Sequence, residues 1–141
     1  MNKILFAITL IFFANTLSAA TFEVEMLNRL GKESMVYSQS VVNIQSGDTV
    51  KWLATTKGHN VQFLSVPEGV GTFRSKLNVD TEYTFTVPGI YLYQCTPHKN
   101  MGMIAVVVVD GNKDNLNAIT SARVAGKSKQ RLAKIIETLS S

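Results

Sequence analysis

Short segments in which apolar and polar residues alternate make up most of the chain between residues 21 and 110. A period of two residues is typical of strands that bury one face. Many short strands with turns between them favour an all-β, antiparallel sandwich or barrel. Pro88–Gly89 predicts a hairpin or corner between the last two of these segments. The alternating pattern predicts strands at residues 22–27, 41–44, 49–53, 60–63, 82–87 and 90–94.

One later segment, Ile104–Val109, is apolar without interruption (IAVVVV) and predicts a strand buried on both faces. After Asp110–Gly111 the spacing of apolar residues changes to that of helices. Residues 114–141 are expected to form two helices, the second beginning near Ser128 and packing its apolar stripe against an edge or face of the sandwich. That stripe contains Leu132, Ile135, Ile136 and Leu139.

The first residues have the pattern of an export signal. Lys3 is followed by an apolar run at residues 4–14 and by small residues up to Ala20. The run is shorter than the roughly 20 residues that span a bilayer, so we expect residues 1–20 to be a cleaved signal peptide and the mature form to have no membrane anchor. Cleavage after Ala19 is the alternative. Residues 21–141 suit a single domain.

Charge and cysteine content narrow the function. The chain carries 14 Lys and Arg against 10 Asp and Glu, a net charge of +4, without a basic stripe interleaved with aromatic residues. This excludes the usual nucleic-acid-binding patterns and is compatible with an acidic protein partner. A single cysteine in an exported protein is either buried and inert or bound to a metal as thiolate.

The metal alternative is favoured by the residues around that cysteine. Cys95, His98, Met101 and Met103 fall within nine residues, and His59 is the only other histidine. Zinc prefers four thiolate or imidazole ligands, which the chain lacks, whereas two imidazoles, one thiolate and a weak axial thioether suit blue copper. Either methionine can supply the thioether.

Other interpretations remain open for these residues. Singly, Cys95 can be a small core residue, His59 a turn residue and His98 a surface residue. A copper chaperone would need soft, exposed ligands, and a thiol enzyme would need Cys95 paired with a base. Together, the four residues at this spacing favour an electron-transfer protein with one copper ion cycling between Cu(II) and Cu(I).

The motifs Gly58-His59-Asn60 and Cys95-Thr96-Pro97-His98, with Met103 eight residues after the cysteine, resemble those of the cupredoxins, and more narrowly of the pseudoazurin family. The resemblance implies an eight-stranded Greek-key sandwich with a C-terminal two-helix extension. It also implies the copper ligands His59, Cys95, His98 and Met103, with Met101 packing the loop. Such proteins are electron carriers and not enzymes.

The same resemblance implies roles around the metal. Asn60 corresponds to an asparagine that donates to the sulfur from its backbone and ties two loops together, and Pro97 has no N–H to donate. Met35 either approaches a histidine ring or packs in the core.

The resemblance also implies partners and location. It implies a periplasmic protein whose partners are acidic redox proteins, with a copper nitrite reductase as acceptor and a cytochrome c or the respiratory chain as donor. We expect the mature protein to be a monomer. Lys57 and Lys76 would dock them. Relatives often carry lysine where this chain has Gln94, and Lys99 can compensate, with Arg29 a further candidate at the rim.

Overall fold

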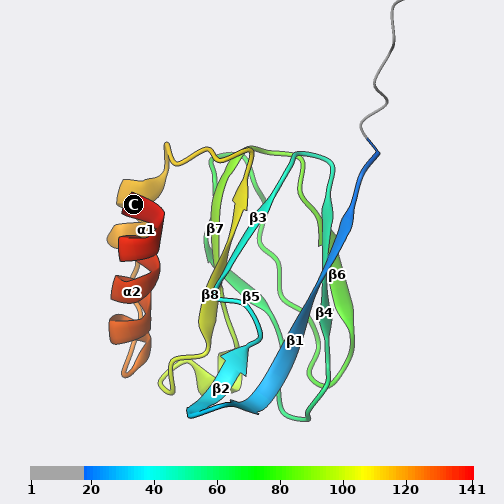
Figure 1. Ribbon diagram of the computed structural model, residues 1–141, viewed down its shortest axis with the longest axis vertical. Coiled ribbons are helices and arrows are strands. Elements are labelled where there is room, and N and C mark those ends of the chain that lie inside the picture. The colour runs from blue at the N-terminus through cyan, green and yellow to red at the C-terminus, as the bar shows by residue number, and fades with distance from the viewer. Residues whose placement is uncertain (1–17) are drawn as a thin grey trace, which may run out of the picture.

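A computed structural model of the protein describes residues 18–141 (Figure 1). Most of the expected signal peptide therefore lies outside the described residues. Eight strands are followed by two helices, and one short 3-10 helix interrupts the strands. The strands are β1 (Thr21–Leu30), β2 (Glu33–Tyr37), β3 (Val41–Ile44), β4 (Thr49–Leu53), β5 (Gln62–Ser65), β6 (Thr81–Thr84), β7 (Gly89–Gln94) and β8 (Ile104–Val109). The helices are η1 (Thr96–His98), α1 (Leu116–Thr120) and α2 (Ser128–Ser140).

The strands form two four-stranded sheets, with the orders β2-β1-β4-β6 and β3-β8-β7-β5. The predicted sandwich is confirmed, and most of its strand pairs are antiparallel as expected, but two are not. β1 pairs with β4 in parallel, and β3 pairs with β8 in parallel. From β2 to β7 each connection crosses from one sheet to the other, so neighbours within a sheet are rarely consecutive in the chain. Such crossings allow neighbouring strands to run in the same direction.

Several predicted strands agree closely with the structure. β3, β4 and β8 have the predicted bounds, whereas the strand expected at residues 60–63 begins two residues later and the one at 82–87 is shortened to β6. Pro88–Gly89 is a corner, because β6 and β7 belong to different sheets. β2 was not predicted. Its short segment contains Met35, whose φ of 52° is unusual for a residue with a side chain in a strand.

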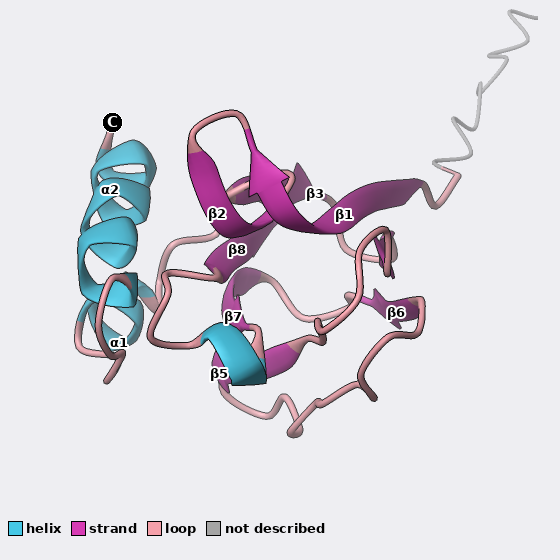
Figure 2. Cartoon of the chain, turned by 90° about the horizontal axis from the view of Figure 1, so that it is seen from below, coloured by secondary structure: helices cyan, strands magenta, loops and turns pink. Residues whose placement is uncertain are grey.

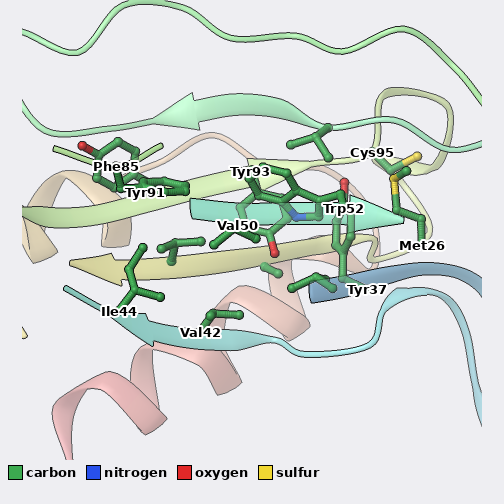
Figure 3. Packing of buried hydrophobic residues seen from close by; sticks show 14 of the residues in the cluster. Met26, Tyr37, Val42, Ile44, Val50, Trp52, Phe85, Tyr91, Tyr93 and Cys95 are labelled. Atoms are coloured by element: carbon green, nitrogen blue, oxygen red, sulfur yellow. The ribbon is translucent and has the colours of Figure 1, made fainter. Parts of the chain in front are cut away.

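The core lies between the sheets and contains a row of large aromatic residues. Trp52 stacks edge-on against Tyr93, and Phe85 against Tyr91, with ring centroids 5.2 and 4.8 Å apart. In Figure 3, Cys95 and Met26 lie at one end of this row and Phe85 and Tyr91 at the other. The cysteine therefore closes one end of the hydrophobic core, where the packed sheets restrict its movement.

A second apolar layer covers the outer face of the sheet that contains β7 and β8. Alternate residues of β7 and β8 point outward and pack against the helices, as predicted for a strand buried on both faces. Leu132, Ile135 and Leu139 of α2 are buried there, whereas Ile136 is only half-buried. The two helices thus pack directly against the sandwich (Figure 1). Within residues 18–141, no helix has the length and apolar character needed to cross a bilayer.

The two ends of the sandwich differ in what they carry. β1 begins at the end where β8 finishes, and the loop between β7 and β8, which includes η1, lies at the opposite end, beside β2 (Figure 1). The chain therefore enters the fold at the end far from Cys95 and His98.

One buried carboxylate gives the fold a defined acid sensitivity. Asp48 is 7% exposed and accepts backbone hydrogen bonds from Ala20 at 2.7 Å and Gln45 at 2.8 Å, which lower its pKa. A carboxyl group with a lowered folded pKa stabilises the fold above its unfolded pKa of about 3.9, and this contribution disappears as the pH falls through the folded value. Asp48→Asn is therefore expected to destabilise the protein at pH 7, and the difference from wild type should shrink progressively as the pH falls below about 4. Urea unfolding at pH 7, 4 and 3 measures this, with the exposed Glu82→Gln as control. A stability gap that is independent of pH would contradict it.

Candidate metal centre

The loop between β7 and β8 brings three of the predicted site residues to the end of the sandwich. Cys95 follows β7 directly, and its backbone N–H donates to the carbonyl of Met103, just before β8, at 2.9 Å. His98 donates its N–H to the Cys95 carbonyl at 3.1 Å and closes the turn of η1, which starts at Thr96 and Pro97. η1 projects at this end of the molecule (Figure 2). His59 comes from the turn that precedes β5.

The structure places Cys95, His59 and His98 within reach of one ion. The Cys95 Sγ lies 3.7 Å from Nδ1 of His59 and 3.4 Å from Nδ1 of His98, and the three ligand atoms lie within 4.8 Å of one another. Metal–sulfur and metal–nitrogen bonds of about 2.3 and 2.0 Å in a roughly trigonal arrangement would separate sulfur and nitrogen by about 3.6–3.8 Å. The cluster therefore fits a soft metal ion.

Hydrogen bonds orient the ring of His59. Its Nε2 lies 2.8 Å from Oδ1 of Asn28 and 3.2 Å from Oγ1 of Thr56. Since a carbonyl oxygen can only accept, Nε2 carries the proton and donates to Asn28, which leaves the lone pair of Nδ1 directed toward Cys95. Such partners fix the tautomer of metal-binding histidines. Asn28 lies 31 residues away on β1, and nothing in the sequence near it signals this role.

Asn60 joins the two chain segments that carry the cluster. Its side-chain oxygen accepts the backbone N–H of Thr96 at 2.8 Å, and its amide nitrogen donates to Oγ1 of Thr96 at 2.9 Å and to the carbonyl of Ser75 at 3.3 Å. Tyr37, which sequence reasoning missed, donates its buried hydroxyl to the Asn60 carbonyl at 2.7 Å. Both the side chain and the backbone of Asn60 are therefore held in place beside His59.

Burial sets the protonation of the cluster. It raises the pKa of the Cys95 thiol, although the backbone N–H groups of Asn60 and His98 oppose the shift. Burial lowers the pKa of His59, with a smaller contribution from His98, and lowers that of His98. Without a metal, the site thus holds a thiol and neutral imidazoles at pH 7. A raised thiol pKa disfavours a nucleophilic cysteine, whereas neutral imidazoles are ready to bind a metal.

The two methionines of the loop differ in their surroundings. Met103 is fully buried in the main core cluster. Met101 is 42% exposed, so the expectation that it packs the loop is wrong. The difference follows from position, because Met103 leads directly into the buried strand β8 and Met101 lies in the turn before it.

The remaining predicted residues near the cluster have distinct positions. Met35 is half-buried and packs against the main core cluster, and Pro97 is exposed. Gln94 is nearly buried and donates from Nε2 to Oε1 of Gln62 at 3.1 Å. At the position where relatives often carry lysine, this chain thus has a glutamine that forms a hydrogen bond between β7 and β5.

Exposed lysines and apolar residues surround the end of the sandwich that carries the cluster. Lys57, Lys76 and Lys99 are exposed, and Leu77 is 48% exposed. Asn78 ties their segment to the cluster, since it accepts the N–H of Gly58 at 2.6 Å and donates its own N–H to the His59 carbonyl at 3.1 Å.

Comparison with known proteins defines the class. Residues 24–110 match the model of the copper-binding proteins of the plastocyanin/azurin family. Together with the sandwich fold and the Cys–His–His cluster, this match shows that the chain belongs to that family, the cupredoxins, whose members are type 1 copper electron-transfer proteins. Copper is accordingly its cofactor.

Individual relatives narrow the class. The pseudoazurin of Paracoccus pantotrophus is 40% identical over 116 residues, covering 81% of this chain and 80% of the relative. A Sinorhizobium pseudoazurin structure superposes with a TM-score of 0.82 at 39% identity, covering 86% of this chain and 98% of that one. The pseudoazurin of Hyphomicrobium denitrificans gives a TM-score of 0.79 at 31% identity, covering 84% and 97%. Within the family, the chain resembles pseudoazurins, as its motifs predicted.

Proposed function

We propose that His59, Cys95, His98 and Met103 bind one copper ion and that the chain carries single electrons between other proteins without acting as an enzyme. The observation that carries this proposal is the convergence of the Cys95 Sγ and the two histidine Nδ1 atoms within 4.8 Å in a largely buried site. Met103 completes the set because it is the buried methionine of the loop. A copper ion held there supplies one-electron chemistry by alternating between Cu(II) and Cu(I).

The residues of the chain restrict movement during that change. Asn28 and Thr56 hold the His59 ring, and Asn60 holds the segment that follows Cys95. Ligands that move little when the metal changes charge keep the reorganisation energy of electron transfer small. Preorganised groups lower the barriers of other reactions in the same way. His98 is half-buried, whereas His59 and Cys95 are buried, so His98 is the most accessible member of the cluster and provides the contact through which a partner exchanges electrons.

The direct test is copper binding followed by spectroscopy. Copper-free protein mixed with Cu(II) is expected to form a stable, intensely blue species with the narrow copper hyperfine splitting of a blue-copper site in its EPR spectrum. It should bleach on reduction and recover on oxidation. Loss of copper during such cycles would instead favour a chaperone. No colour at all would refute the electron carrier.

Location and partners rest on the export signal and the family. The protein is proposed to act as a monomer in the periplasm, accepting electrons from a cytochrome c and donating them to a copper nitrite reductase. Exposed Lys57, Lys76 and Lys99 beside the exposed apolar residues Leu77 and Met101 support an acidic docking partner. Redox encounters of this kind are small and short-lived.

The docking proposal predicts a charge-dependent rate. The double variant Lys57→Glu with Lys76→Glu is expected to slow association with an acidic nitrite reductase about tenfold at low salt, because it replaces attraction with repulsion. Stopped-flow kinetics at several ionic strengths measure this. Arg123→Glu with Lys134→Glu, on the helical side, makes the same change in net charge and serves as control. Equal slowing in both double variants would place docking elsewhere.

A further inference from the structure

The beginning of α2 contacts the loop that lies between His98 and Met103. Ser128 donates its hydroxyl to the Lys99 carbonyl at 2.6 Å, and the N–H of Lys127 donates to the Asn100 carbonyl at 2.9 Å. Ser128 is completely buried although it is polar. Its hydroxyl therefore depends on this loop for a partner, and the loop carbonyl depends on Ser128.

Backbone packing at the same place is unusually close. A Cβ atom on Gly126 would lie 2.3 Å from the Asn100 carbonyl oxygen, and Gly126 has a φ of +55°. Only glycine permits both the approach and the conformation. One turn further along α2, Arg131 forms an ion pair with Glu33 of β2, which ties the start of the helix to the sandwich. Figure 1 shows the start of α2 at the same end of the molecule as this loop.

We propose that Ser128 is a positioning residue for the metal centre, and that the start of α2 fixes the distance between His98 and Met103. This inference rests on the proposed function. Of the loop residues between His98 and Met103, the first two have their carbonyls held from α2, while the N–H groups of Met101 and Met103 both donate to the His98 carbonyl, at 2.9 and 3.4 Å. Releasing Lys99 and Asn100 therefore loosens the loop between two metal ligands. The helical extension is thus part of the redox site as well as a cover for the sheet.

The test compares Ser128→Ala with Thr138→Ala, which removes a hydroxyl at the far, exposed end of the same helix. In copper-free Ser128→Ala, amide hydrogen exchange at Met101 and Met103 is expected to be about tenfold faster, with β8 unchanged. In the loaded protein, release of Cu(I) to a chelator should accelerate by a similar factor, with an altered EPR spectrum. Ser128→Thr, which keeps the hydroxyl, should restore wild-type values.

Exchange and copper release equal to those of Thr138→Ala would overturn the positioning role. If Ser128→Ala does not fold, Glu33→Gln, which weakens the ion pair to Arg131, should produce a smaller effect in the same direction, and no effect there would also overturn it. Hydrogen exchange is measured without copper, so failure of the wild-type protein to bind copper would refute the proposed function and leave the loop result standing.

A separate observation concerns the start of the mature chain. Asp48 accepts the N–H of Ala20, and the Ala20 carbonyl accepts the N–H of Thr49 at 2.9 Å. Among residues 18–141 the only salt bridge is that of Arg131 and Glu33, so no basic side chain neutralises the nearly buried Asp48. Asp110 lines the same hollow and adds negative charge. Buried carboxylates are normally paired with a cation.

We infer that export processing hydrolyses the Ala19–Ala20 bond and that the new terminal ammonium group of Ala20 pairs with Asp48. A signal peptidase adds water across this amide, leaving a carboxylate on Ala19 and an amine on Ala20, which is protonated. Residues 18–20 are exposed and accessible to such an enzyme. Cleavage after Ala20 would remove both of its hydrogen bonds to the fold.

Intact mass and N-terminal sequencing of the exported protein are expected to show a chain that starts at Ala20, and a start at Thr21 would overturn the inference. The charge is tested with chains starting at Ala20 and at Ser18, the latter keeping the Ala20 amide without its charge. Asp48→Asn should lower the melting temperature by several degrees more in the Ala20 chain than in the Ser18 chain. Equal losses would show that no ammonium pair forms.

Discussion

Cys95→Ser is expected to abolish the intense blue colour of the copper-loaded protein completely. The colour of such sites arises from charge transfer between a thiolate and Cu(II), and Cys95 is the only cysteine in the chain. Serine has nearly the same shape but supplies a hard, protonated oxygen in place of the thiolate. Copper affinity should therefore fall further than the 10- to 100-fold losses typical of changes outside the ligand set. Absorption spectroscopy and competition with a Cu(I) chelator measure the two effects.

Two methionine variants provide the matched comparison. Met101→Leu changes an exposed thioether of the same loop and should leave the colour and affinity unchanged, whereas Met103→Leu should keep the colour but alter the EPR spectrum and the reduction potential. If Cys95→Ser stayed blue, the sulfur would not be a ligand. If Met101→Leu rather than Met103→Leu changed the spectrum, Met101 and not Met103 would be the thioether ligand.

Asn60→Ala is expected to lower the free energy of unfolding by about 2–4 kcal/mol, because the part-buried backbone N–H of Thr96 and two further groups lose their partners together. Asn60 is 2% exposed, and its amide spans the segments before β5 and after β7. Urea unfolding of copper-free protein gives this value. Copper should also leave the variant faster, since the side chain at position 60 no longer fixes Thr96, the residue that follows Cys95.

Thr96→Ala is the control for this variant. It removes only the hydroxyl partner and keeps the hydrogen bond from the Thr96 N–H to Asn60, so it should cost less than half as much. If Asn60→Ala and Thr96→Ala were equally destabilising, the hydrogen bond from the Thr96 N–H would contribute nothing to stability. Asn60 would then act only through its hydrogen bond to the Thr96 hydroxyl.

Sequence patterns predicted those parts of the fold whose burial is uniform. Ile104–Val109 could be assigned because it is covered on one face by the core and on the other by the helices, and both faces demand apolar side chains. The apolar stripe of Leu132, Ile135 and Leu139 could be predicted because one face of α2 is buried along its whole length. The cysteine and the two histidines stood out because the chain contains so few of either residue.

Contacts between distant segments could not be read in the same way. β2 escaped prediction because its burial does not alternate, with Val36 and Tyr37 both buried, and because the backbone at Met35 leaves the usual strand region. Asn28 and Tyr37 reach the metal centre through hydrogen bonds to residues more than 20 positions away, so no local spacing marks them. The parallel pairing of β3 with β8 also depends on crossings between layers, which a pattern of alternation does not encode.

The placement of the first strand has a practical consequence. β1 starts at the end of the sandwich opposite to the loop of Cys95 and His98 (Figure 1). A linker fused ahead of Ala20 can therefore attach the molecule to an electrode with its histidine face directed into solution. Voltammetry on such a film would record exchange with dissolved partners without the support blocking their approach.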